Sequence, residues 1–327
     1  MADVLVMYKE SDLTPMVITK EHIRKIQACI TGRVYWCGSE DEAIERGYDA
    51  EVLFLWGGSG PMPEQYCARS ANLRWIQSFS AGVNPIMDGP ISHLPVRLTN
   101  AKGIHGKTMA LTTIGYMISF MRNSQELYRR QMKHIWDKKF DIQPLEAEGM
   151  TVGIIGAGAI GCEIAKLSKS LGMRVLGVKR TVTPLTYFDE VFSNEELDTV
   201  LAQSDFVIVV LPLTDETRHL FGREKFRIMK PTAVLINIAR GPVVKEEDLI
   251  QALECGQIGG AALDTVEEEP LAKDSVLWDM ENVIITPHCA ADSRAYIDRA
   301  VHMFCENLRL YERGKPLINE INMKKRY

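Results

Sequence analysis

The chain has 327 residues, of which 46% are hydrophobic and 25% charged, and its formal net charge at pH 7 is −5. This size and composition predict a globular protein of about two domains. Scattered lysines and arginines argue against a nucleic-acid partner, and the longest strongly apolar stretch, 206–213, is too short to cross a membrane. The start of the chain shows no basic leader or apolar signal core. The seven cysteines are dispersed without a C-x-x-C pair, which favours reduced thiols in a cytoplasmic protein and no metal site.

The first hundred residues alternate between strand-like and helix-like segments. The spacing of Ile23, Ile26 and Ile30 predicts a helix over 20–30. Ser39 to Glu42 has the form of a capping box that opens a second, shorter helix. Strands are expected at 4–8, 33–37, 51–56, 73–77 and 96–99. This βα alternation predicts a parallel sheet covered by helices.

Beyond residue 100 the pattern changes and then resumes. An amphipathic helix is expected over 107–122, followed by a polar, tryptophan-containing stretch at 131–144. Further strands are expected at 150–155, 173–178, 205–211, 233–238, 260–263 and 283–286, and further helices at 159–171, 193–203 and 246–255. From residue 293 the chain is expected to form one long helix and a short tail.

A glycine-rich turn lies between the strand expected at 150–155 and the helix that follows it. Residues 153–161 read Gly-Ile-Ile-Gly-Ala-Gly-Ala-Ile-Gly, which contains G-x-G-x-x-G in the strand–turn–helix context of a dinucleotide fingerprint. Gly156 allows the tight turn, Gly158 lets a pyrophosphate approach the backbone, and Gly161 lets the helix pack against the strand. The N-terminus of the helix offers N–H groups and a positive dipole end to the phosphates.

The end of the second strand of this unit predicts which dinucleotide is bound. An acid usually stands there and binds the ribose 2′-hydroxyl, whereas this chain has Lys179, Arg180 and Thr181 and no acid between Glu163 and Asp189. Two cations and a hydroxyl would hold a 2′-phosphate. NADP(H) is therefore the preferred cofactor, and NAD(H) remains possible if these residues form only a basic surface turn.

The fingerprint begins near residue 150, so another domain must precede it. The first hundred residues lack a closing helix, which the last helix of the chain can supply. We therefore expect residues 1–100 and 292–327 to form a discontinuous substrate-binding domain, and residues 101–291 to form a dinucleotide-binding domain. The predicted fold class is α/β, with two Rossmann-like or flavodoxin-like, doubly wound parallel-sheet domains and a ligand cleft between them.

Several separated sequence blocks also occur in a recognisable order. They are Ser-Ala-Gly-Val-Asn at 80–84, Asn-Ala-Lys-Gly at 100–103, the fingerprint, Leu-Pro-Leu-Thr-Asp-Glu-Thr at 211–217, Asn-Ile-Ala-Arg-Gly at 237–241, Leu-Asp-Thr-Val-Glu-Glu-Glu-Pro-Leu at 263–271 and Thr-Pro-His at 286–288. From about residue 70 to residue 300 the chain resembles the D-isomer-specific 2-hydroxyacid dehydrogenase family, and within it the glyoxylate/hydroxypyruvate reductase-like enzymes. The first 70 residues match only in pattern.

The resemblance implies a catalytic set of Arg240, Glu269 and His288. A guanidinium can grip a 2-keto acid's carboxylate in a geometry that lysine cannot reproduce, and can polarise the carbonyl. An imidazole is a natural proton donor, and Glu269 would hydrogen-bond the second ring nitrogen of His288. The choice of Glu269 over its two neighbouring glutamates rests on the family pattern. Backbone N–H groups from Ala81, Gly82 and Val83 would form a second clamp on the carboxylate.

The resemblance also implies contacts to the cofactor. These are Ala159 and Ile160 at the pyrophosphate; Lys179, Arg180 and Thr181 at the 2′-phosphate; Leu211 and Pro212 beside the adenosine, with Thr217 nearby; and Ile238, Ala239, Arg240 and Asp264 facing the nicotinamide. Asp264 is a candidate acceptor for the carboxamide of the cofactor. Cys289 is expected to be a small residue lining the pocket, with a nucleophilic role as the alternative.

A homodimer formed through the 105–145 segment is a further implication of the resemblance. Trp136 lies in that segment and is a candidate substrate-binding residue that would wall the neighbouring subunit's pocket. The alternative is that Trp136 only packs within the dimer arm.

Together these features predict NADP(H)-dependent reduction of small 2-keto acids, of the glyoxylate or hydroxypyruvate type, to D-2-hydroxy acids. One alternative is an NAD-linked dehydrogenase working in the oxidative direction, against which Lys179 speaks. Another is a non-catalytic, dinucleotide-sensing binding protein, and formate oxidation fits the cofactor and site pattern less well. The sequence does not identify the keto acid.

Overall fold

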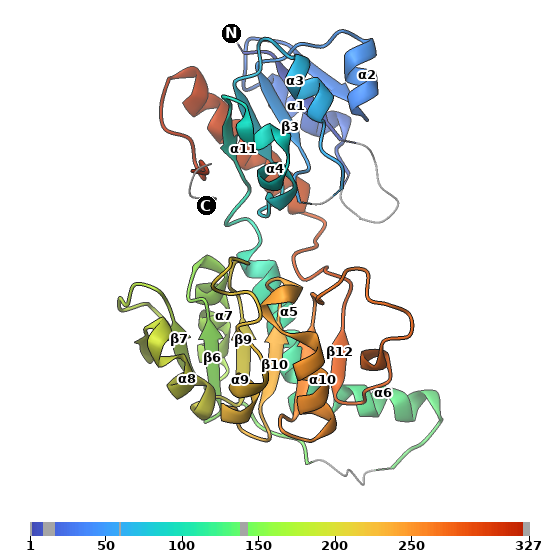
Figure 1. The fold of residues 1–327 in the computed structure, drawn as a ribbon, viewed down its shortest axis with the longest axis vertical. Helices are drawn as coiled ribbons and strands as arrows, with labels where there is room; N and C mark the ends of the chain where they lie inside the picture. Colours follow the sequence, from blue (N-terminus) through green and yellow to red (C-terminus); the bar gives the residue numbers. More distant parts are fainter. Residues whose placement is uncertain (1, 9–16, 59, 138–142, 323–327) are drawn as a thin grey trace. The chain divides into compact units, whose positions relative to one another are not determined.

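The computed structural model describes residues 2–8, 17–58, 60–137 and 143–322 (Figure 1). The chain divides into two compact units, one of residues 1–104 with 292–327 and one of residues 105–291. Each unit is built on a parallel sheet, which confirms the predicted fold class of two doubly wound α/β domains. Across the described residues, no helix has both the length and the apolar character needed to cross a membrane.

In the described part of the first unit, five parallel strands are ordered β2-β1-β3-β4-β5, the flavodoxin-like order. The strands are β1 (Val4–Met7), β2 (Val34–Cys37), β3 (Val52–Leu55), β4 (Trp75–Ser78) and β5 (Arg97–Thr99). The helices are α1 (Lys20–Gln27), α2 (Glu40–Glu45), α3 (Glu64–Arg69), α4 (Asn84–Asp88), the 3₁₀ helix η1 (Pro90–His93) and α11 (Tyr296–Glu312).

Helix α11 packs on this first sheet although it comes from the end of the chain. Phe304 stacks on Phe54 of β3 with ring centroids 4.2 Å apart. The amide of Asn307 donates to Oε1 of Gln77 at 2.9 Å. Because α11 covers one face and the α2–α4 side chains bury the other, β1 and β3 are buried along their whole length, as in a sheet covered on both faces.

In the second unit, the described residues form a seven-stranded parallel sheet in the order β12-β11-β10-β9-β6-β7-β8. The strands are β6 (Thr151–Ile155), β7 (Arg174–Val178), β8 (Glu190–Phe192), β9 (Phe206–Val209), β10 (Val234–Asn237), β11 (Gly260–Leu263) and β12 (Val283–Ile285). The helices are α5 (Gly106–Met121), α6 (Ser124–Met132), α7 (Ala159–Ser170), η2 (Asn194–Glu196), α8 (Leu197–Gln203), α9 (Arg223–Ile228), η3 (Gly241–Val243), α10 (Glu246–Glu254) and η4 (Val276–Trp278). Strand β6 lies where the order reverses, with β7 on one side and β9 on the other.

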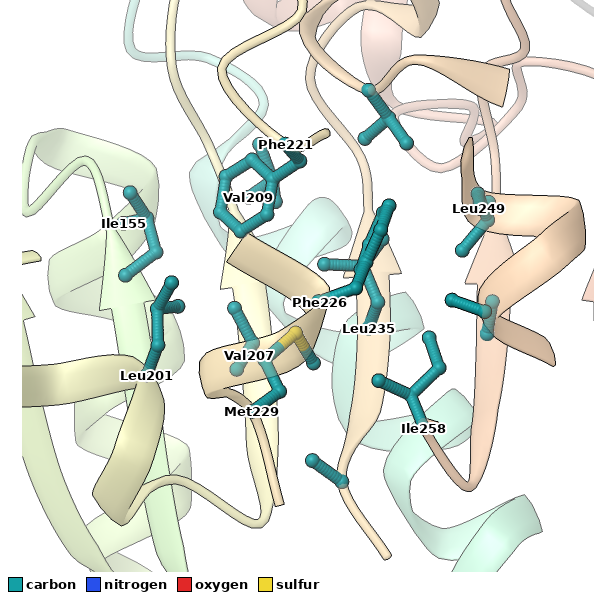
Figure 2. Packing of buried hydrophobic residues seen from close by; sticks show 14 of the residues in the cluster. Ile155, Leu201, Val207, Val209, Phe221, Phe226, Met229, Leu235, Leu249 and Ile258 are labelled. Atoms are coloured by element: carbon teal, nitrogen blue, oxygen red, sulfur yellow. The ribbon is translucent and has the colours of Figure 1, made fainter. Parts of the chain in front are cut away.

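Alternate residues of each strand point to opposite faces of this sheet and belong to two separate hydrophobic cores. Ile154 points to the face covered by α5 and α7, whereas Ile155 points to the face covered by α8, α9 and α10. Figure 2 shows the second face, where Phe226 of α9 packs with Val207 and Leu235 of the strands. These two cores fix the strands, and therefore the loops at their carboxyl ends.

The structure departs from the expected elements in a few places. Helices α3, α4, α6 and α9 and strand β8 were not expected. The expected capping box at Ser39 is only half present. The Ser39 hydroxyl accepts the N–H of Glu42 at 3.2 Å, but the Glu42 carboxylate accepts the N–H of Gly38, at 2.8 Å, and not that of Ser39.

Candidate active site

Three adjacent strands of the second unit direct the candidate catalytic residues to one edge of the sheet. Strands β10, β11 and β12 pair in parallel, so their carboxyl ends lie at the same edge. Arg240 follows β10, Glu269 lies in the loop after β11, and His288 follows β12. Ligands bind at this edge in open α/β sheets.

His288 and Glu269 form a hydrogen-bonded pair. Nδ1 of His288 lies 2.8 Å from Oε2 of Glu269, and both side chains are partly open to solvent, with 47% and 40% of their surface exposed. The neighbouring Glu267 turns instead to His219, whose Nε2 lies 2.5 Å from Oε1 of Glu267. His288 has a φ of +51°, which is an uncommon conformation for a residue other than glycine.

Asp264 holds the loop that carries His288. Its buried carboxylate accepts the hydroxyl of Thr286 at 2.7 Å and the backbone N–H groups of Cys289 and Ala290 at 2.9 and 3.0 Å. Its carbonyl accepts the N–H of His288 at 2.8 Å. The predicted contact of Asp264 with the nicotinamide carboxamide stays a prediction, because the carboxylate is used here to shape the loop.

Tyr116 of α5 extends this network and was not among the residues singled out from the sequence. Its hydroxyl lies 2.6 Å from that of Thr286. Burial raises the pKa of Tyr116 to about 12, so the hydroxyl is a neutral donor over the physiological range. The two residues are 170 positions apart in the sequence, and no motif links them.

Arg240 projects from a loop that Asn237 shapes. The Asn237 amide donates to the carbonyl of Arg240 at 3.2 Å, and its oxygen accepts the N–H of Ala239 at 3.1 Å. Burial lowers the pKa of the Arg240 guanidinium, and the nearby carboxylate of Glu269 partly opposes that effect. Within the described residues no carboxylate forms an ion pair with this guanidinium, whose Nη1 donates to the carbonyl of Ala239 at 2.6 Å. The site therefore presents a partly desolvated cation.

The loops that carry Arg240 and Glu269 pack backbone to backbone. A Cβ on Gly241 would lie 1.7 Å from the carbonyl oxygen of Val266, so only glycine fits. The N–H of Glu246 donates to the Glu267 carboxylate at 3.0 Å, and the N–H of Glu267 donates to the Glu246 carboxylate at 3.2 Å. These contacts fix the spacing of the two loops.

The glycine-rich turn has the form that a bound pyrophosphate requires. Gly156 has a φ of +110°, and a Cβ there would lie 2.6 Å from the carbonyl oxygen of Val210. A Cβ on Gly161 would lie 2.7 Å from the carbonyl oxygen of Gly156. A Cβ on Gly158, in contrast, would meet nothing within 4 Å. Internal packing therefore explains Gly156 and Gly161, whereas Gly158 keeps the N-terminus of α7 open.

Lys179, Arg180 and Thr181 follow the carboxyl end of β7. Lys179 is half-buried, and its Nζ donates to the hydroxyl of Thr183 at 3.3 Å, while Arg180 and Thr181 are exposed. Within the described residues none of the three forms an ion pair with a carboxylate. The basic side chains are thus available to an anion.

The remaining cofactor candidates lie after β9 and β10. Leu211 is half-buried and Pro212 exposed, and the Thr217 hydroxyl closes their loop by donating to the carbonyl of Pro212 at 2.7 Å. Ile238 and Ala239 are buried at the carboxyl end of β10. Their side chains support the loop, and only their backbone is placed to meet a ligand.

Ala81, Gly82 and Val83 lie in the first unit, between β4 and α4. The Ser80 hydroxyl donates to the carbonyl of Gly82 at 2.6 Å, and the Asn100 amide donates to the carbonyl of Ala81 at 2.7 Å. Both contacts use carbonyl groups. None of the N–H groups of residues 81–83 donates to another residue that the structure describes, so they remain available to an anion.

Trp136 lies just after α6 and is 96% exposed. The expected polar stretch at 131–144 includes residues 138–142, which lie outside the described residues. Over the described part of the chain, no group of three or more metal-ligating side chains could hold an ion.

The sequence of the chain is similar to a known protein family and to individual proteins. The family model for the D-isomer specific 2-hydroxyacid dehydrogenase NAD binding domain matches residues 114–290, which is more than half of the chain. A glyoxylate reductase of Korarchaeum cryptofilum is 31% identical over 299 residues, covering 88% of this chain and 87% of that protein.

Solved structures are similar over nearly the whole length. A D-isomer specific 2-hydroxyacid dehydrogenase family protein from Aeromonas salmonicida has a TM-score of 0.87 and 32% identity, covering 98% of this chain and 99% of that one. The NADPH-dependent glyoxylate/hydroxypyruvate reductase of Sinorhizobium meliloti, in complex with NADP and sulfate, has a TM-score of 0.82 and 26% identity, with both chains fully covered.

Proposed function

The chain belongs to the D-isomer-specific 2-hydroxyacid dehydrogenase family and is an NAD(P)-dependent oxidoreductase, and from that premise we propose that it reduces small 2-keto acids of the glyoxylate or hydroxypyruvate type to D-2-hydroxy acids. NADP(H) is the proposed cofactor. Residues 105–291 are the proposed dinucleotide-binding domain, and residues 1–104 with 292–327 the proposed substrate-binding domain.

The observation that carries this proposal is a half-buried guanidinium without an ion-pair partner among the described residues, accompanied by a proton donor. Arg240 is partly desolvated without an ion-pair partner among the described residues, so a substrate carboxylate would supply the missing charge. The carboxylate of Glu269 interacts electrostatically with Arg240 and raises the pKa of its guanidinium. The same carboxylate hydrogen-bonds His288. The site therefore offers Arg240 as a cation for the substrate carboxylate and His288 as an acid for the substrate carbonyl oxygen.

The residues perform separate tasks in the proposed reaction. Arg240 grips the carboxylate and polarises the adjacent carbonyl. Because Nδ1 of His288 faces Glu269, Nε2 is the ring nitrogen that delivers the proton to the carbonyl oxygen. Glu269 keeps the ring oriented and stabilises its protonated form. The free N–H groups of residues 81–83 are the proposed additional donors to the carboxylate.

The residues present fit a bound dinucleotide. Gly158 to Ile160 would hold the pyrophosphate, because a Cβ at Gly158 would fill open space at the N-terminus of α7. Leu211 and Pro212 would border the adenosine. When bound, the reduced nicotinamide supplies the hydride that the carbonyl carbon accepts. Asp264, which shapes the His288 loop, is the proposed acceptor for the carboxamide.

The NADP(H) preference rests on the half-buried Lys179 and on Arg180, which have no carboxylate partner among the described residues. The negative charge of a 2′-phosphate would neutralise these two cations. The Sinorhizobium reductase is itself described as NADPH-dependent. Changing Lys179 to Asp together with Arg180 to Ala should move the ratio of kcat/KM values from NADPH toward NADH. An unchanged ratio would contradict this assignment of the 2′-phosphate site.

The activity is tested by following the reduced-nicotinamide absorbance. NADPH and NADH are supplied in parallel against glyoxylate, hydroxypyruvate, pyruvate and phenylpyruvate. Rapid loss of NADPH with one of the small keto acids is expected, and the series ranks the pocket by size. Tight NADPH binding without turnover of any of them would contradict the proposed reaction and favour a dinucleotide-sensing protein.

We also propose a homodimer formed through the 105–145 segment, with Trp136 walling the substrate pocket of the neighbour. Its 96% exposed indole supports this, because it stands in a segment with several exposed apolar side chains, and such gatherings are typical of interaction sites. Trp136→Ala should raise KM for the keto acid, whereas Trp278→Ala, which removes a 53% exposed tryptophan elsewhere in the second unit, should not. Unchanged kinetics in both variants would leave Trp136 a packing residue only.

A further inference from the structure

Two cysteines far apart in the sequence bring their thiols together in the first unit. Sγ of Cys29 donates to the carbonyl oxygen of Lys25 at 3.2 Å, and Sγ of Cys305 donates to the same oxygen at 3.7 Å. The two sulfurs therefore lie beside the same backbone oxygen. All seven cysteines of the chain are free, so this pair is in its dithiol form.

Regular structure holds both partners in place. Cys29 lies two residues beyond the end of α1, and Cys305 lies within α11. The contact between these elements is fixed two turns earlier on α11, where Asp298 accepts from Lys25 at 3.1 Å and contacts His22 at 3.3 Å. The pair therefore belongs to a packed interface of one unit.

The two thiols differ in exposure and in charge environment. Cys29 is half-buried, and Nη2 of Arg309 donates to its sulfur at 3.5 Å. Cys305 is only 6% exposed, and burial raises the pKa of its thiol to about 12. An oxidant reaches an exposed sulfur more readily than a shielded one. Cys29 is thus the accessible partner and Cys305 the shielded one.

We propose that Cys29 and Cys305 are a redox pair, in which peroxide oxidises Cys29 and Cys305 resolves the product as a disulfide. The Cys29 thiolate attacks one peroxide oxygen, the O–O bond breaks, and sulfenic acid and water are formed. The Cys305 sulfur then attacks the sulfenic sulfur, the S–S bond forms, and a second water leaves. The two thiols lose two electrons and two protons, and the peroxide gains them.

This proposal is independent of the proposed reductase activity. Formation of the disulfide would join the end of α1 covalently to α11. Thiol–disulfide exchange in a reducing compartment would reverse it. The disulfide requires the sulfurs to move to about 2.05 Å apart, and both already lie within 3.7 Å of the same carbonyl oxygen.

The test treats the full reduced chain with one to two equivalents of hydrogen peroxide, blocks remaining thiols by alkylation, and measures intact mass and non-reduced peptides. We expect the oxidised chain to take up two fewer alkyl groups than the unoxidised chain, and a peptide joining Cys29 to Cys305 that is about 2 Da lighter than the two reduced peptides together, both reversed by dithiothreitol. Peroxide treatment that leaves both thiols alkylatable, or that joins Cys29 to another cysteine, would overturn the pair.

Variants separate the two roles. Cys305→Ala should trap the Cys29 sulfenic acid, detected as a dimedone adduct, whereas Cys29→Ser should leave Cys305 unmodified by peroxide. Cys255→Ser is the matched control, because Cys255 is exposed and lies in the second unit; this variant should still close the disulfide. A dimedone adduct on Cys305 in Cys29→Ser, at the wild-type rate of oxidation, would overturn the assignment of Cys29 as the attacking thiol.

Discussion

Arg240 is the residue on which the proposed chemistry depends most, because its half-buried guanidinium has no ion-pair partner among the described residues. Arg240→Lys keeps the charge but loses the planar fork that matches a carboxylate. We expect kcat/KM for the keto acid to fall by about 10²–10³, the usual effect of removing one preorganised donor. NADPH affinity, measured by fluorescence titration, should stay near the wild-type value.

The exposed Arg227 of α9 offers a matched control for this change. Arg227→Lys alters the same side-chain type away from the sheet edge and should leave kcat/KM unchanged. Wild-type turnover by Arg240→Lys would remove Arg240 from the mechanism.

Single residues also show what sequence reasoning can reach at a site. Arg240, Glu269 and His288 follow three consecutive strands, and the resemblance to a family whose motifs match at these positions was enough to single them out. The sequence alone could not distinguish Glu269 from its neighbours by chemistry, whereas in the structure Glu267 contacts His219 and Glu269 contacts His288. The Tyr116 link to the His288 loop depends on how α5 packs, so no local pattern could predict it.

The loops after β10 and β11 together hold Arg240 and Glu269 in place, because the two backbones are in contact at Gly241. A Cβ there would lie 1.7 Å from the Val266 oxygen, so Gly241→Ala must push the loops apart. We expect kcat to fall more than NADPH binding does, since the change separates Arg240 from Glu269 without reaching the fingerprint turn. Single-turnover kinetics and a binding titration measure the two effects.

Gly115→Ala in α5 is the control for the added methyl group, because a Cβ at Gly115 meets nothing within 4 Å. Alanine also favours a helix over glycine by about 1 kcal/mol, so this variant should be at least as stable as the wild type. If Gly241→Ala turned over like Gly115→Ala, the close approach of the two loops would have no part in catalysis.

The fingerprint turn allows a second pair of substitutions to separate packing from binding. Gly158→Ala places its methyl group in open space, so the fold should be kept while dinucleotide affinity drops. Gly161→Ala places its methyl group 2.7 Å from the Gly156 carbonyl oxygen and should lower the midpoint of thermal unfolding. Calorimetry with and without NADPH distinguishes them. Full NADPH affinity in Gly158→Ala would argue against a pyrophosphate at this turn.

Elements buried on both faces were the ones that the sequence predicted well. The core strands read as continuous apolar runs because helices cover both sides of each sheet. Strand β8 was missed because it is a three-residue edge strand that is partly exposed. Helix α9 was missed because its six residues bury only Phe226, which is too little periodicity to recognise.

For the whole molecule, apolar surface in the second unit is concentrated on the 105–145 segment. Eight of the fourteen large hydrophobic residues that are exposed in the described part of the chain lie there: Leu111, Ile118, Leu127, Tyr128, Met132, Ile135, Trp136 and Leu145. Gathered exposed apolar side chains are typical of a site that binds another protein, a membrane or a ligand. Here they support the proposed homodimer that the sequence resemblance implied.

The proposed dimer can be tested at two positions that are both strongly exposed. Leu111 of α5 is 67% exposed and Met132 of α6 is 64% exposed, so Leu111→Glu with Met132→Glu should not disturb either core. Two charges buried at a dimer interface without partners would oppose association. Sedimentation velocity should show a dimer for the wild type and a monomer for the double variant. Val276→Glu, at a 48% exposed position outside the segment, should remain dimeric. A wild type that sediments as a monomer at micromolar concentration would contradict the proposed interface, and with it any contribution of Trp136 to a neighbouring subunit.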